Sequence, residues 1–159
     1  MADIRTSTGG VPSFWFEDFW IGAEFDLGIA VADRDEIIDF AKRYDPQWYH
    51  IDEDAARDST WGELIASGWW TGSVMMRQYA TSFLSKAAPD ASPGMENLRW
   101  YKGIKAGDIL NITMKVTDLQ PSSRGDHLGT AYLEWTATVD GVRVASMTGR
   151  GWFHRRPAA

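Results

Sequence analysis

Residues 68–84 read GWWTGSVMMRQYATSFL, and this stretch constrains the architecture more than any other part of the chain. Its apolar side chains occupy nearly all sides of a helical wheel: Trp69, Trp70, Val74, Met75, Met76, Tyr79, Ala80, Phe83 and Leu84. A helix that is apolar all round is a buried helix. The rest of the chain must therefore supply a surface that covers it.

Short runs on both sides of this segment alternate apolar and polar residues, with the period of two that a half-buried strand shows. These runs are 25–31, 110–117, 131–139 and 142–153. Asp140 and Gly141 separate the last two, and Asp-Gly is a strong signal for a two-residue hairpin. The pattern predicts an antiparallel sheet of about five strands with one apolar face.

The sheet and the helix together predict an α+β fold of the hotdog type, in which an antiparallel sheet wraps around a long buried helix. Residues 1–13 are polar and rich in Gly, Ser and Thr, so we expect a flexible N-terminal segment, followed by a single domain over residues 14–157. Such a sheet has an open edge, which a second copy can cover. We therefore expect a homodimer or a higher homo-oligomer.

The composition excludes several classes of function. The 159 residues contain no Cys, which excludes disulfides, thiolate metal sites and a cysteine nucleophile. A net charge of −6, from 16 basic and 22 acidic residues, argues against a nucleic-acid partner. The N-terminus lacks the apolar run of a signal peptide or a membrane span, so we expect a cytoplasmic protein that does not associate with membranes.

Two short helices are predicted between the first strand and the apolar helix. Asp33, with Glu36 three residues later, resembles a capping box at the start of the first helix. Pro46 ends that helix, because the residue before a proline is pushed out of the helical region. Asp52 is expected to cap the second helix.

The segment between these helices, residues 44–52, reads YDPQWYHID and concentrates a carboxylate, an imidazole and aromatic rings. Because Pro46 breaks the helix, the segment can bring Asp45 and His50 to one point. Such a pair can hold a water molecule and move protons near neutral pH. The alternative is an Asp that caps a turn and a His that bonds to the backbone. A metal site at His50 and the acidic residues 52–54 is weaker, because helix capping explains those acids, and we expect no metal and no cofactor.

Residues 64–70, LIASGWW, lead directly into the apolar helix. Free amides at a helix N-terminus can bind a polarised carbonyl oxygen, and Gly68 would let a ligand approach the backbone closely. The alternative is that Ser67 caps the helix and that Gly68 serves tight packing. The candidate substrate-binding residues are those beside these two elements: Trp48, Ser67, Trp69 and Trp70.

Four segments together resemble the MaoC-like dehydratase family over nearly the whole chain: YDPQWYHID, ELIASGWWT, ENLRWYKGIKAGD and the closing FHRRP. That family has a hotdog fold and includes hydratases that add water to thioesters of coenzyme A, or remove it. The resemblance implies a lyase in which Asp45 and His50 are the catalytic pair and the amide of Gly68 polarises the thioester carbonyl. Gln47 and Trp48 stand where the commonest hydratase form has Asn and Pro.

The substrate implied by this resemblance is a 2-enoyl-CoA or a 3-hydroxyacyl-CoA thioester. Three indoles beside the two catalytic elements predict a preference for short or compact acyl groups. Two other functions fit a hotdog domain, namely an acyl-CoA thioesterase and a non-catalytic subunit that binds an acyl group. The presence of both Asp45 and His50 argues against the non-catalytic alternative.

Overall fold

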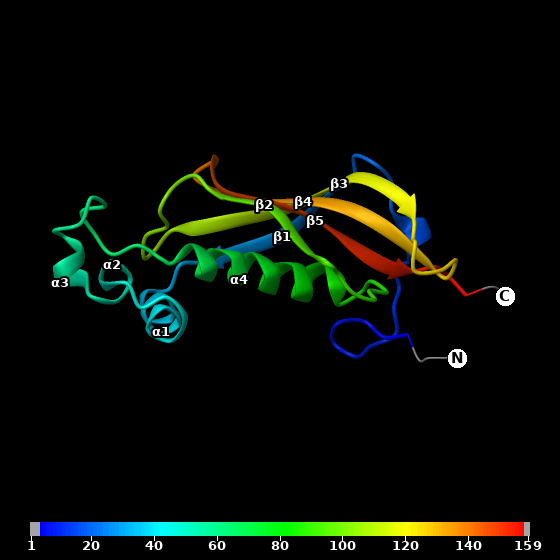
Figure 1. The fold of residues 1–159 in the computed structure, drawn as a ribbon, viewed down its shortest axis with the longest axis horizontal. Coiled ribbons are helices and arrows are strands. Elements are labelled where there is room, and N and C mark those ends of the chain that lie inside the picture. Colours follow the sequence, from blue (N-terminus) through cyan, green and yellow to red (C-terminus); the bar gives the residue numbers. More distant parts are fainter. Residues whose placement is uncertain (1–3, 158–159) are drawn as a thin grey trace.

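One antiparallel sheet curves over a central helix, as the sequence predicts (Figure 1). The computed structural model describes residues 4–157. The elements in chain order are η1 (Phe16–Asp18), β1 (Glu24–Val31), α1 (Arg34–Tyr44), α2 (Trp48–Ile51), α3 (Glu53–Ala56), α4 (Gly68–Gln78), η2 (Tyr79–Leu84), β2 (Gly94–Trp100), β3 (Ile109–Pro121), β4 (Leu128–Val139) and β5 (Val142–His154). Within residues 4–157, no helix is long and apolar enough to cross a lipid bilayer.

The strands stand in the order β1-β3-β4-β5-β2, and each neighbouring pair is antiparallel. The β4–β5 hairpin turns at Asp140 and Gly141, whose φ angles are 50° and 75°. A two-residue turn of this kind requires positive φ at both positions, which Asp-Gly adopts readily. Val139 and Val142 pair directly across the turn. The hairpin prediction is therefore confirmed.

The edge strand β2 is the one strand that the apolar alternation did not identify. Six of its seven residues are exposed, and it pairs with β5 along one side only. Because most of its side chains lie outside the core, no period of two marks it in the sequence. Its other side leaves backbone donors and acceptors without a partner strand in the described part of the chain.

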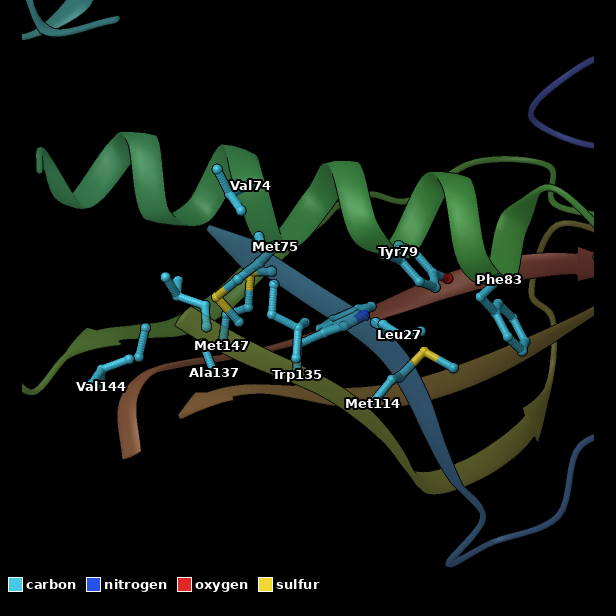
Figure 2. Packing of buried hydrophobic residues seen from close by; sticks show 14 of the residues in the cluster. Leu27, Val74, Met75, Tyr79, Phe83, Met114, Trp135, Ala137, Val144 and Met147 are labelled. Atoms are coloured by element: carbon cyan, nitrogen blue, oxygen red, sulfur yellow. The ribbon is translucent and has the colours of Figure 1, made fainter. Parts of the chain in front are cut away.

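The concave face of the sheet packs against one side of α4 and η2 (Figure 2). Met75, Tyr79 and Phe83 point toward the sheet and are almost fully buried, and Val74 on the same helix is buried as well. Their partners come from four strands: Leu27, Met114, Trp135, Ala137, Val144 and Met147. This contact between helix and sheet is the main hydrophobic core.

The opposite side of α4 is not covered by the chain. Trp69 is 59% exposed and Met76 is 40% exposed, whereas the sequence predicts burial on all sides. The reason is that a single sheet covers only one side of a helix. The uncovered apolar residues form part of the surface that lies beside β2.

Two hydrogen bonds fix the position of this helix against the edge strand β1. A bulge in β1 precedes Gly28, which has a φ of 90°. Ser82 Oγ donates to the carbonyl oxygen of Leu27 at 2.8 Å, and Gln78 Nε2 donates to that of Ile29. Since β1 is an edge strand, its outer side has no partner strand in the described part of the chain, and the helix supplies donors to these two carbonyls.

The short helices α1, α2 and α3 gather beside the N-terminal end of α4 (Figure 1). Asp33 caps α1 by accepting a hydrogen bond from Glu36 N at 2.9 Å, and Asp52 caps α3. Both predicted caps are confirmed. The single turn α2 lies between Pro46 and Asp52, within the segment that the sequence presents as a loop, and it carries His50.

The N-terminal segment makes contacts that its composition does not predict. Ser7 N donates to the carbonyl oxygen of Leu84 at 3.0 Å, and Ser13 N donates to that of Lys86 at 2.9 Å. Thr6 is buried. Residues 4–13 therefore pack against the end of the central helix, while residues 1–3 of the expected flexible segment lie outside the described residues.

Two isoleucines on β3 provide a matched test of this core. Ile112 is fully buried, whereas Ile109 is 49% exposed on the same strand. We expect Ile112→Ala to lower the free energy of unfolding by about 2–5 kcal/mol, and Ile109→Ala by about 1 kcal/mol or less. Urea denaturation at a fixed protein concentration measures both. Equal losses in the two variants would contradict the position of the core.

Candidate active site

The turn after α1 brings Asp45 and His50 together, as the sequence predicts. Asp45 N donates to Ala41 O at 2.9 Å, so the backbone of Asp45 completes the last turn of α1 before Pro46 redirects the chain. Asp45 Oδ2 lies 3.5 Å from His50 Nε2. The side chains are 19% and 6% exposed, respectively, so both are largely removed from water.

The imidazole of His50 is oriented by the segment that precedes α4. His50 Nδ1 lies 2.7 Å from the carbonyl oxygen of Ile65. Because a carbonyl oxygen only accepts, Nδ1 carries a proton, and in the neutral ring Nε2 then has a lone pair. Tyr49 O accepts a hydrogen bond from Ile65 N at 3.3 Å, which holds the same two segments together. The free nitrogen of His50 is thereby directed toward Asp45.

The carboxylate of Asp45 accepts a hydrogen bond at each oxygen. Ser67 Oγ donates to Oδ2 at 2.6 Å, and Gln47 Nε2 donates to Oδ1 at 2.8 Å. The hydrogen bond from Ser67 contributes most to lowering the pKa of the Asp45 carboxyl; burial opposes this effect, and Gln47 and the charge of His50 add to it. Asp45 is therefore held as a carboxylate.

With Nδ1 of His50 bonded to Ile65, Nε2 is the ring nitrogen that lies 3.5 Å from Asp45 Oδ2. A water molecule can bridge these two atoms, because it can donate one hydrogen to Asp45 Oδ2 and the other to His50 Nε2. Its oxygen would lie about 2.8 Å from each atom. The arrangement can therefore hold a water molecule between a carboxylate and an imidazole.

The N-terminus of α4 combines a cap with a free amide. Ser67 Oγ accepts a hydrogen bond from Trp69 N at 3.2 Å while it donates to Asp45. Among residues 4–157, the N–H of Gly68 has no acceptor. A free amide at the positive end of a helix dipole attracts a negative or polarised oxygen. The capping function of Ser67 and the availability of the Gly68 amide are therefore compatible.

His50 and Gly68 line the same pocket, which has a volume of about 200 Å³. Aromatic side chains from four further positions form much of its wall: Tyr49, Trp61, Trp100 and Tyr101. Asp45 is not part of the pocket lining, but its Oδ2 lies 3.5 Å from His50 Nε2. The pocket therefore presents one imidazole and one free amide to a ligand.

Trp100 is a pocket residue that sequence reasoning missed. A Cβ on Gly68 would lie 2.5 Å from Cε2 of this indole, so the ring packs directly against the glycine backbone. The Trp100 ring also meets that of Trp69 edge to face, with the centroids 5.5 Å apart. No local pattern signals this contact, because it forms only when the edge strand β2 passes the start of α4.

Of the four candidate substrate-binding residues, none lines this pocket. Ser67 is buried and donates a hydrogen bond to Asp45 Oδ2. Trp70 is 1% exposed and packs in the core, while Trp48 and Trp69 are about half exposed on other surfaces. The side chains of consecutive helical residues point about 100° apart, so Trp69 and Trp70 cannot both face a ligand bound at the Gly68 amide. The indoles that do line the pocket belong to Trp61 and Trp100.

The acidic residues after His50 have structural partners. Asp52 accepts hydrogen bonds from the backbone amides of Asp54 and Ala55, and Glu53 accepts one from Arg34 Nε at 2.7 Å. In the described range 4–157, no three His, Asp or Glu side chains gather as metal ligands would. Helix capping, the alternative to a metal site, therefore accounts for the position of Asp52.

A sheet wrapped around one helix, with a carboxylate–imidazole pair beside the helix N-terminus, defines an α+β domain with a candidate acid–base site. The model of the family described as "MaoC like domain" matches residues 21–138. The chain therefore belongs to the MaoC-like family, which confirms the resemblance seen in the sequence.

Solved structures agree with this assignment. The crystal structure of the MaoC-like dehydratase from Rhodospirillum rubrum is 32% identical, covers 92% of this chain and 100% of its own, and has a TM-score of 0.85. The R-hydratase PhaJ1 from Pseudomonas aeruginosa shares the fold at 17% identity, with 90% and 87% of the two chains covered and a TM-score of 0.75. The predicted hotdog fold is thus confirmed.

A curated relative is more distant. The uncharacterized protein YdeM from Bacillus subtilis is 28% identical over 105 residues, which is 66% of this chain and 74% of that protein. Its description assigns no activity.

The contact between Gly68 and Trp100 predicts a coupling between these two positions. We expect Gly68→Ala to lower the free energy of unfolding by about 1–3 kcal/mol, because the new methyl group collides with the Trp100 ring. In a Trp100→Leu background, Gly68→Ala should lower the free energy of unfolding by less than about 1 kcal/mol. Chemical denaturation of the four proteins of this cycle measures the coupling.

Gly72→Ala is the matched control, because a Cβ at Gly72 has no atom within 4 Å in the same helix. Gly72→Ala should leave the free energy of unfolding unchanged or raise it by about 0.5–1 kcal/mol. Equal effects of Gly68→Ala in the two backgrounds would show that Trp100 does not determine the need for glycine.

Proposed function

We propose that this protein is a lyase that adds water to a 2-enoyl-CoA thioester or removes it from a 3-hydroxyacyl-CoA thioester. The observation that carries the proposal is that His50 and the free amide of Gly68 line one pocket, with the Asp45 carboxylate 3.5 Å from His50. Membership of the MaoC-like family and the fold shared with an R-hydratase support it.

In the direction of hydration, the water held by Asp45 and His50 attacks C3 of the enoyl group. The water gives one proton to His50 Nε2, and its oxygen forms the new bond to C3. The electron pair of the C2–C3 double bond moves toward the thioester carbonyl, where the N–H of Gly68 stabilises the developing negative charge. His50 then returns the proton to C2. The net change is the addition of one water without oxidation or reduction.

The hydrogen bonds at the site support different roles for Asp45 and His50. Because Ser67 and Gln47 lower the pKa of the Asp45 carboxyl, this group is a weak base and remains charged. Asp45 therefore orients the water and stabilises the imidazolium form of His50. His50 has the lone pair that takes the proton, since its other nitrogen is committed to Ile65.

Loss of either residue of the pair should abolish most of the activity. We expect Asp45→Asn and His50→Gln each to lower the hydration rate by about 100-fold or more, while the circular dichroism spectrum is unchanged. His127→Gln is the matched control, because this imidazole lies in the loop after β3, away from the site. The assay follows the enoyl absorbance over a series of enoyl and 3-hydroxyacyl thioesters of coenzyme A.

Near-normal turnover in either variant would refute the assignment of the catalytic pair. Release of free thiol without a change in enoyl absorbance would instead identify a thioesterase. Failure of the wild-type protein on every thioester, with the fold intact, would overturn the proposed function.

We further infer that the protein forms a homodimer through the β2 edge. The strand has free backbone groups along one side, and apolar residues flank it. A pocket of about 250 Å³ between α4 and the strands β2 and β5 is lined mainly by such residues: Trp69, Met76, Met95, Leu98 and Met147. A second β2 strand would satisfy the edge and cover this surface.

Sedimentation analysis tests this assembly. The wild-type protein should have twice the mass of the 17.9 kDa chain at micromolar concentration. Met95→Glu should shift it toward the monomer, because a charge would be buried in the interface. Val142→Glu, at an exposed position beside the β4–β5 turn, should leave the mass of the assembly unchanged. A wild-type monomer under these conditions would refute the dimer.

A further inference from the structure

A series of two hydrogen bonds connects Asp45 to Tyr49 in the wall of the pocket. The hydroxyl of Tyr49 donates to Gln47 Oε1, and Gln47 Nε2 donates to Asp45 Oδ1 at 2.8 Å. The ring of Tyr49 lines the pocket and meets the imidazole of His50 edge to face, with the centroids 4.5 Å apart. The series therefore connects a residue that a ligand would touch with a carboxylate that it would not.

The direction of each bond in this series is fixed by the chemistry of the groups. An ionised carboxylate only accepts, so the amide nitrogen of Gln47 must face Asp45. The amide oxygen then faces the other way and accepts a hydrogen bond from the hydroxyl of Tyr49. Each group thus has a single orientation. Ser67 holds the other oxygen of Asp45, so the carboxylate is fixed at both ends.

The backbone places Gln47 for this task. Gln47 N donates to Asp45 O at 2.7 Å, and His50 N donates to Gln47 O at 2.9 Å. Gln47 therefore lies in the middle of the tight turn that joins the two residues of the pair. From this position its side chain reaches back to Asp45 over a short distance, although the residue itself is exposed to solvent.

We propose that Gln47, held in place by Tyr49, is a positioning residue that keeps Asp45 Oδ2 turned toward His50. The catalytic consequence rests on the proposed function, because Asp45 must hold the water in line with His50 Nε2. Without Gln47, the carboxylate loses the bond at Oδ1 and gains freedom to rotate about χ2. The charged form of Asp45 also loses a donor, so its pKa rises.

The chain contains a matched control for this series on the sheet, outside the pocket lining. Tyr132 OH donates to Gln120 Oε1, and Gln120 Nε2 donates to Asp118 Oδ2 at 2.7 Å. This second Tyr–Gln–Asp series lies on β3 and β4 and includes no histidine. Tyr132→Phe and Gln120→Ala therefore remove the same kinds of hydrogen bond without touching Asp45.

The first experiment needs no enzymatic activity. The pKa of the Asp45 carboxyl is measured by carbon NMR, with Asp45→Asn used to assign the signal. Gln47→Ala should raise this pKa, and Tyr49→Phe should raise it less, because Tyr49 acts through Gln47. The control variants should leave it unchanged. His50 is the titratable side chain that faces Asp45, and it is present in all of these variants.

The second experiment measures kcat and KM against pH. For Gln47→Ala we expect kcat to fall about 10-fold with little change in KM, which is the effect of losing a hydrogen bond to a charged group. Because a raised pKa protonates Asp45 at higher pH, the acid limb of the profile should move upward in pH. Gln47→Glu keeps the size of the side chain and should move the limb further, because a second carboxylate then faces Asp45.

The outcomes separate this proposal from the proposed function. An unchanged pKa of Asp45 in both Gln47→Ala and Tyr49→Phe overturns the proposal, whether or not the protein is an active hydratase. A raised pKa with unchanged kcat and an unchanged acid limb overturns the positioning role in catalysis. A raised pKa in a protein that turns over no thioester supports the hydrogen-bond series and overturns only the proposed function.

Discussion

Burial of one side of α4 and η2 against the curved sheet is the interaction on which the site depends. Met75 and Phe83 lie in this contact, and Gln78 and Ser82 tie the same helix to carbonyl groups beside the bulge in β1. Together they fix the helix along its length and against rotation. Its first N–H groups, including that of Gly68, therefore have a fixed position without any contribution from a ligand.

The candidate acid–base pair lies on a short turn that contacts the segment before this helix. Asp45 and His50 are five residues apart, so the turn alone brings them close. Their orientation comes from outside the turn, because Ile65 holds the imidazole and Ser67 holds the carboxylate. The segment from Ile65 to Gly68 thus serves both halves of the site. A change in this segment would disturb the pair and the free amide together.

The surface left open by the fold lies next to the site. One sheet covers one side of α4, so Trp69 and Met76 stay exposed beside the free edge of β2. Trp100 belongs to that edge strand and also covers the backbone of Gly68. Any partner that pairs with β2 would therefore contact the strand that forms a wall of the pocket. Trp100 therefore lies between the free edge of the sheet and the pocket.

The sequence by itself determined the elements that depend on neighbours within a few residues. The caps at Asp33 and Asp52, the Asp-Gly hairpin and the approach of Asp45 to His50 are of this kind, because each is settled by local backbone geometry. The tertiary structure alone decided that β2 is a strand, that Trp100 rather than Trp69 or Trp70 lines the pocket, and that α4 is covered on one side. These features depend on which distant segments pack together, and the bond from Ser67 to Asp45 joins residues that are 22 positions apart. Periodicity reports whether a residue is apolar, but only packing determines what it contacts.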